Sequence, residues 1–210
     1  MANFSTEGYG FLPYGADLNE NDFIYAYVPS SDSTALGIGS PVKKVGTSNT
    51  AVLTLGSNRV AGAHGFDIGQ LPVVAHALDG ATDKVWGVVV AVLPNHNDFT
   101  AVNYRPASVE AVVRIARVHR GRLFRVMSDA AVPAASVGLN VNMSASPTVS
   151  TVFGKSKAVV DGGNAAADVT FQFKIVSIGR NPSQSDITAA GVELIVEGNV
   201  GYDVYPDVGI

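Results

Sequence analysis

The sequence contains no cysteine and comparatively little charge. Without cysteine, disulfide bonds, thiolate metal sites and cysteine nucleophiles are excluded, so stability must come from packing and strand pairing. Charged residues make up 15% of the 210 residues and hydrophobic residues 47%, which is typical of a packed globular protein with an unusually uncharged surface. We therefore expect partners to cover much of this surface.

The sequence also lacks long apolar runs. No stretch approaches the roughly 18 apolar residues of a membrane span, and residues 1–7 lack the basic start and apolar run of a secretory signal. The net charge of −4 and the pI of about 5.5 give no overall attraction to nucleic acid or to an anionic membrane. We expect a protein of the cytosol, or of an assembly formed there, that binds neither nucleic acid nor a membrane.

Motifs that would indicate catalysis, a metal or a cofactor are missing as well. The four histidines are widely separated, and none has the spacing that places two metal ligands on one face. No nucleophile elbow, phosphate-binding loop or dinucleotide fingerprint is present, and the carboxylates are scattered. The sequence therefore predicts no enzyme, no catalytic residue, no metal and no cofactor, with a hydrolase whose site is assembled from distant residues as an alternative.

Short apolar runs rich in Val, Ile, Tyr and Thr, separated by Gly, Pro, Asn or Asp, fill most of the chain. They predict a mainly β protein with a single domain over residues 23–210. About a dozen short strands indicate a sandwich or a barrel. The candidate strands are 23–28, 36–43, 51–55, 71–77, 85–93, 100–104, 123–127, 139–143, 158–160, 169–178 and 192–200.

Three segments support more detailed expectations. Residues 169–178 alternate apolar and polar side chains, which predicts a strand with one buried face. Residues 86–93 are apolar throughout and predict a central strand that is covered on both sides or faces another subunit. Residues 108–118 fit a strand or a helix, and we favour a strand because the flanks are β and Gly121 could close a hairpin.

Residues 1–22 mix glycine, aromatic and polar residues without a period and predict an extended N-terminal arm. Large apolar side chains on such an arm are costly to expose, so they must dock on the chain's own domain or on a neighbour. The tail, residues 202–210, is similar. If a neighbour is contacted, the candidate contact residues are Phe4, Tyr9, Phe11, Leu12, Tyr14, Tyr202 and Tyr205.

The strongest charge feature is a cluster of basic residues within 105–125, where Glu110 is the only acidic residue. Guanidinium groups bind carboxylates or phosphates through paired hydrogen bonds, and the alternative is the solvated face of a hairpin. The net negative charge and the scarcity of interleaved aromatics favour a protein partner over nucleic acid. The cluster comprises Arg105, Arg114, Arg117, His119, Arg120, Arg122 and Arg125, and we expect Arg117, Arg120 and Arg122 to contact a partner.

Several stretches of the chain resemble the small cement or decoration proteins that tailed phages, especially short-tailed ones, encode beside their major capsid protein. The resemblance runs along most of the chain and is carried by residues 8–15, 25–43, 87–90 and 104–108. The most specific part runs from Tyr27-Val28-Pro29-Ser30 to Gly39-Ser40-Pro41-Val42. One departure is the basic run 117–122, where similar proteins often have an acidic turn, which suggests a differently charged partner surface.

The resemblance implies a jelly-roll β-sandwich that forms a homo-dimer or homo-trimer and binds the outer surface of an icosahedral capsid in virions assembled in the host cytoplasm. Its partners would be the major capsid protein and further copies of itself, and many modest contacts would reinforce the shell. A carbohydrate-binding or receptor-binding module on a virion is the alternative. Against that alternative, the only tryptophan, Trp86, falls in an apolar strand and not on an aromatic platform.

Overall fold

A computed structural model describes residues 9–15, 23–50, 66–78, 83–93, 103–144 and 148–199. Within these ranges the chain is mainly β, as the sequence predicts, and its only helices are three short 3-10 helices, at Ala134–Ser136, Gly162–Asn164 and Pro182–Gln184. No helix in the described part is long and apolar enough to cross a membrane. The strands are β1 (Leu12–Tyr14), β2 (Phe23–Val28), β3 (Pro41–Gly46), β4 (Val73–His76), β5 (Gly87–Val92), β6 (Ala111–Arg117), β7 (Leu123–Met127), β8 (Asn140–Val141), β9 (Phe173–Ile178) and β10 (Glu193–Gly198).

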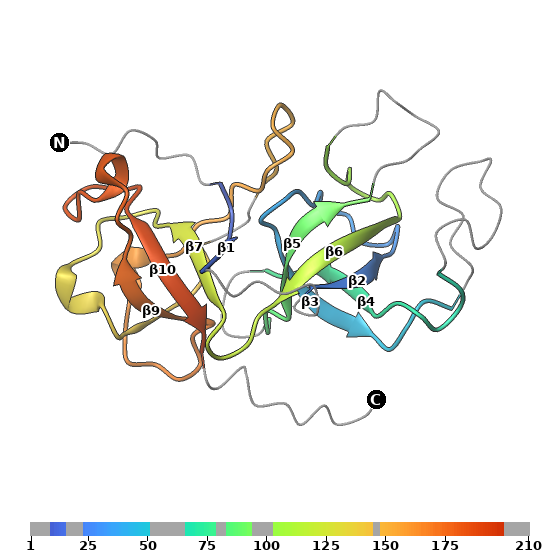
Figure 1. Cartoon of the computed structure of the whole chain (residues 1–210), viewed down its shortest axis with the longest axis horizontal. Helices are drawn as coiled ribbons and strands as arrows, with labels where there is room; N and C mark the ends of the chain where they lie inside the picture. The colour runs from blue at the N-terminus through green and yellow to red at the C-terminus, as the bar shows by residue number, and fades with distance from the viewer. Residues whose placement is uncertain are drawn as a thin grey trace.

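The strands form a closed barrel and a separate sheet that lie side by side (Figure 1). The barrel has the order β2-β4-β3-β5-β6 and closes where β6 pairs with β2. Its pairs are antiparallel except for β2 with β4. The sheet has the order β1-β7-β10-β9-β8 and is antiparallel throughout. The short turn between β6 and β7 therefore connects the barrel directly to the sheet.

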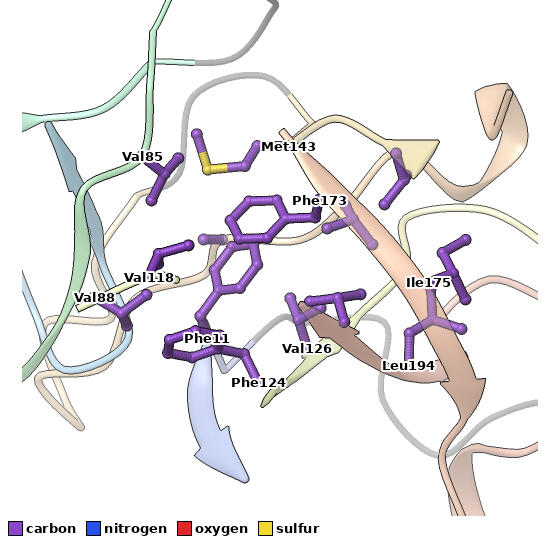
Figure 2. Packing of buried hydrophobic residues seen from close by; sticks show 14 of the residues in the cluster. Phe11, Val85, Val88, Val118, Phe124, Val126, Met143, Phe173, Ile175 and Leu194 are labelled. Carbon is purple, nitrogen blue, oxygen red and sulfur yellow. The ribbon is translucent and has the colours of Figure 1, made fainter. Parts of the chain in front are cut away.

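Two clusters of buried apolar residues hold this arrangement together. One cluster fills the barrel and consists mainly of valines, together with residues such as Leu36 and Ile115. The larger cluster lies between the barrel and the sheet, where the rings of Phe11, Phe124 and Phe173 meet (Figure 2). Because barrel residues such as Val88 belong to this larger cluster, burial of apolar surface joins the two sheets.

Several strand predictions are confirmed. β2 and β7 have the predicted bounds 23–28 and 123–127, and 108–118 contains a strand, β6, and no helix. Gly121 has a φ of +84°, a value that favours glycine, and lies in the turn between β6 and β7. The hairpin expected there is wrong, because β6 pairs with β2 and β5 in the barrel whereas β7 pairs with β1 and β10 in the sheet. β5 is covered on both faces at Val88 and Val89, as its continuous apolar run predicts, because Val88 packs in the cluster between the barrel and the sheet and Val89 packs inside the barrel.

Other predicted strands are shorter than expected. Strand β9 begins only at Phe173, and Val169 is 73% exposed. The reason is local: the carboxylate of Asp168 accepts hydrogen bonds from the backbone and hydroxyl of Thr170, forming a turn that competes with strand pairing. Segments 36–40 and 158–160 form isolated bridges, while 51–55 and 100–102 lie outside the described residues.

Candidate partner-binding surfaces

The N-terminal segment 9–15 docks on the chain's own domain. Phe11 is fully buried and stacks on Phe173, with ring centroids 4.7 Å apart and an interplanar angle of 25°. β1 then pairs with β7, which places Leu12 opposite Arg125. The expectation that Phe11 contacts a partner is therefore wrong, because this ring fills the space between the barrel and the sheet (Figure 2).

Two glycines allow segment 9–15 to pass close to the backbone of another part of the chain. Gly10 and Gly39 both have positive φ, +76° and +88°, and their backbones lie against each other. A Cβ atom on Gly10 would lie 2.7 Å from the carbonyl oxygen of Gly39, closer than real contacts allow. The amide of Phe11 donates to that same oxygen at 3.0 Å. Gly10 and Gly39 thus serve a close backbone crossing.

Tyr9 fastens the segment to strands β7 and β10 of the sheet. Its hydroxyl donates to Oε2 of Glu193 at 2.8 Å, and the guanidinium of Arg125 lies 5.5 Å from the centre of its ring. Burial and the hydrogen bond to Glu193 raise the pKa of Tyr9 far above its usual value, so the phenol stays protonated. Among the large apolar residues of the arm that the structure describes, Tyr14 is the most exposed, at 44%. Phe4, Tyr202 and Tyr205 lie outside the described residues.

The basic cluster does not form one surface. Arg105 is 1% exposed and Arg122 is 7% exposed, so the expectation that Arg122 contacts a partner is wrong for the chain by itself. Arg117 is half-buried, and its guanidinium lies 5.7 Å from the centre of a Trp86 ring. Arg120, in the turn after β6, is exposed. Guanidinium groups that are neighbours in sequence face different parts of the fold because β6 belongs to the barrel and β7 to the sheet.

Arg105 instead organises a buried network, which we call the Arg105 network. Its guanidinium donates hydrogen bonds of 2.5 to 2.8 Å to four backbone carbonyl oxygens, those of Pro29, Asp32, Thr34 and Val109. The carboxylate of Asp32 lies 3.6 Å away and balances the charge. Burial lowers the pKa of Arg105, and the satisfied donors allow a buried cation to be retained.

The same network joins two distant parts of the sequence. Leu36 and Arg105 exchange both of their backbone hydrogen bonds, at 2.9 and 2.7 Å. Ser108, which has a φ of +58°, donates its amide to the carbonyl of Asp32 at 3.0 Å. Segments 25–43 and 104–108, which carry the resemblance described above, therefore meet in one hydrogen-bonded unit.

The outer wall of the barrel carries a group of rings that we call the aromatic face: Phe23, Tyr25, Tyr27 and Phe66, with Arg114. Strand β2 alternates, so that its aliphatic residues face the barrel interior and its three aromatic residues face outward.

Contacts within the aromatic face hold its rings in place. The rings of Tyr25 and Phe66 lie 5.2 Å apart, and the guanidinium of Arg114 lies 4.6 Å from the centre of the Phe23 ring. The hydroxyl of Tyr27 donates to Oε2 of Glu110 at 3.1 Å. Tyr25 is 41% exposed, whereas Phe23 also packs on the cluster between the barrel and the sheet, so the accessible part of the face is centred on Tyr25. It offers flat apolar ring surface, which suits binding by stacking.

Sequence reasoning missed this face, although its signal was present. The run Phe-Ile-Tyr-Ala-Tyr-Val at 23–28 was recognised as a strand, and a period of two places its three aromatic residues on one side. What the run could not show is which side meets solvent. That depends on the closure of the barrel, which turns the aliphatic side inward.

His76 is the buried titratable side chain without a role in these surfaces. It is 4% exposed, and neither ring nitrogen has a hydrogen-bond partner. Burial lowers its pKa, so the ring is neutral near pH 7. The neighbouring Lys43 and Asp83 are paired with each other at 2.8 Å. No group of three or more His, Asp or Glu side chains in the described ranges could hold a metal ion.

No protein-family model, curated protein or solved structure matches this chain. We therefore infer the function from the residues of the chain and from the resemblance that its sequence carries.

Proposed function

We propose that this chain is a structural virion protein that binds the outer surface of an icosahedral phage capsid as a homo-oligomer and stabilises contacts between major capsid protein subunits. The observation that carries the proposal is the Arg105 network. Two of the four segments of the resemblance, 25–43 and 104–108, are distant in sequence but share this network. A resemblance that falls on one structural unit is a stronger argument for kinship than matches scattered over unrelated loops.

The exposed surfaces support the same proposal. The aromatic face on the barrel, Tyr14 on the sheet and Arg120 at the turn between them provide separate contact points on one body. Each is small, and multivalent attachment of many copies to a shell converts small contacts into firm binding. A cement protein requires this kind of rigid body with several contact points and no reaction centre.

The proposal does not depend on the finer architecture. The resemblance implies a jelly-roll sandwich, and this topology remains part of the proposed relationship to the cement proteins. The closed barrel beside a sheet serves the function equally well, because a shell-binding protein needs a rigid body and not a particular strand order.

The test is to add purified protein to phage heads assembled without it and to examine the particles by electron cryomicroscopy. We expect density at regular positions on the outer surface and greater resistance of the heads to heat. Tyr25→Ser and Tyr14→Ser form a matched pair, since the two rings are 41% and 44% exposed on the barrel and the sheet. Reduced occupancy for one of them identifies the side that faces the shell. Bare heads at saturating wild-type protein would refute the proposal.

The second candidate function is a carbohydrate-binding or receptor-binding module displayed on a virion. The aromatic face favours it, because adjacent rings with hydroxyl and guanidinium donors are suited to the apolar faces and hydroxyl groups of sugars. A glycan array separates the two functions. Specific binding by the wild type that Tyr25→Ala abolishes would favour the module, and an array without signal would favour the cement protein.

A further inference from the structure

A β-hairpin formed by residues 148–157 extends away from both sheets (Figure 1, light orange). Val149 and Ser156 form an antiparallel bridge, and the amide of Ser150 donates to the carbonyl of Lys155 at 2.8 Å. The amide of Gly154 closes the turn by donating to Ser150 at 2.8 Å. We call this element the 148–157 hairpin. It has its own hydrogen bonds and is a defined structure.

The tip of the hairpin is apolar and exposed. Val152 is 78% exposed and Phe153 is 72% exposed. Turns of this kind usually contain Gly, Asn, Asp or Ser, because these residues fit the backbone and are well solvated. A phenylalanine at such a position leaves a large ring in water with no folding benefit. The tip therefore has the character of a binding element.

The backbone beneath the tip is fixed in the body of the protein. Ile38 donates its amide to Gly154 at 3.0 Å and accepts from the amide of Ser156 at 2.8 Å. A Cβ atom on Gly154, whose φ is +66°, would lie 2.6 Å from the carbonyl oxygen of Asn103, and one on Gly37 would lie 2.5 Å from the oxygen of Gly154. Two glycines thus let the hairpin pack closely on the domain. A tip held in this way loses little conformational entropy when it binds.

We propose that Phe153 and Val152 insert into an apolar pocket with an acidic rim on the capsid protein that forms the shell. This inference rests on the function proposed above and names the contact that would carry it. The charge of the hairpin indicates the acidic rim, because residues 148–157 contain Lys155 and Lys157 and no carboxylate. On a chain with a net charge of −4, this local positive charge favours an acidic partner surface.

The size of the tip argues against a second copy of this chain as the occupant. A phenylalanine side chain buries about 150–250 Å², whereas a stable pair of proteins buries roughly 800 Å² on each partner. The tip is too small to hold a dimer by itself. It is sufficient as one anchor of a protein that also contacts the shell elsewhere and binds in many copies.

The experiment measures the affinity of purified variants for heads assembled without this protein. We expect Phe153→Ser to weaken binding about tenfold or more, as loss of a central aromatic anchor does. Val152→Ser and Val169→Ser are a matched pair, since the two side chains are 78% and 73% exposed in different loops. Of this pair, only Val152→Ser should weaken binding. Thermal unfolding of all three variants should match the wild type, because the exchanged side chains are largely exposed.

Each result has a defined meaning. If the wild type binds and Phe153→Ser binds equally well, or if Val169→Ser weakens binding as much as Val152→Ser, the inference is wrong while the proposed function stands. If the wild type does not bind heads, both are wrong. Light scattering of free protein is the third measurement, since a change of oligomeric state in Phe153→Ser would show that a second copy occupies the tip and would overturn the inference.

Discussion

The N-terminal segment 9–15 and the 148–157 hairpin contain the same local feature and use it in opposite ways. Each places a phenylalanine next to a glycine with positive φ, Phe11 after Gly10 and Phe153 before Gly154. Phe11 is fully buried and Phe153 is 72% exposed. In the first case the glycine lets the chain enter the space between barrel and sheet, and in the second it anchors the backbone and leaves the ring outside. An aromatic residue in an irregular segment thus does not reveal where its contact lies.

The arginines repeat this contrast. Arg105 and Arg120 belong to the same basic stretch, but one is 1% exposed with four carbonyl acceptors and the other is exposed in a turn. The two residues are of the same type, but their surroundings in the fold differ. The following predictions compare an inward residue with an outward residue of the same type, from the largest expected effect to the smallest.

The largest effect is expected for Arg105→Ala. The substitution leaves four carbonyl oxygens without their donor and Asp32 without its counter-ion, so we expect a loss of about 4 kcal/mol in the free energy of unfolding. Arg120→Ala is the matched control and should change stability by less than about 0.5 kcal/mol. Urea unfolding followed by tryptophan fluorescence measures both. Equal losses would show that the Arg105 network does not stabilise the fold.

Phe11→Ala should lower the free energy of unfolding by about 3 kcal/mol, since it opens a cavity between the barrel and the sheet. Phe153→Ala should leave it within about 0.5 kcal/mol of the wild type. The same urea titration compares them. The inward and outward assignment of these two rings would be contradicted if Phe153→Ala were the more damaging change.

Tyr9→Phe removes the hydroxyl that donates to the buried carboxylate of Glu193. We expect a loss of about 1–2 kcal/mol, the usual cost of removing a hydrogen bond to a charged group. Tyr14→Phe is the control and should have no measurable effect, because Tyr14 lies at the surface and is 44% exposed. Thermal unfolding at constant pH is the measurement. A Tyr9→Phe variant as stable as the wild type would mean that the hydrogen bond does not anchor the segment.

The smallest effect concerns pH and His76. Burial lowers the pKa of this ring below its ordinary value of 6.5, so below pH 6.5 the unfolded chain takes up a proton that the folded chain refuses. Its contribution to stability is therefore complete above pH 6.5 and is lost as the pH falls toward the folded-state pKa.

The measurement is the melting temperature between pH 7.5 and 5, a window that spans roughly the ordinary histidine pKa. We expect His76→Gln to flatten the decline on the acidic side relative to the wild type. His119→Gln, in the turn between β6 and β7, provides the control and should leave the decline in place. An unchanged slope in His76→Gln would contradict the assignment of the pH dependence to this residue.

Part of the site could be predicted from the sequence, and the reasons are specific. The aromatic content of residues 9–14 correctly signals that these side chains need a contact, and docking on the chain's own domain was one of the two alternatives. The arginines between 105 and 125 were grouped because they are close in sequence, yet β6 and β7 carry them into a barrel and a sheet. The exposed Val152 and Phe153 were overlooked because two apolar residues in a turn have no period that marks them.

The sequence by itself determined the β class, the bounds of β2 and β7 and the cover on both faces of β5, because β-branched and aromatic runs punctuated by turn residues encode these features locally. The tertiary structure alone decided which side of β2 faces solvent, where Phe11 lies, and that Arg105 joins residues 29–34 to residue 109. These outcomes depend on barrel closure and on contacts between segments distant in sequence. Local periodicity constrains each strand, whereas burial depends on which strands meet.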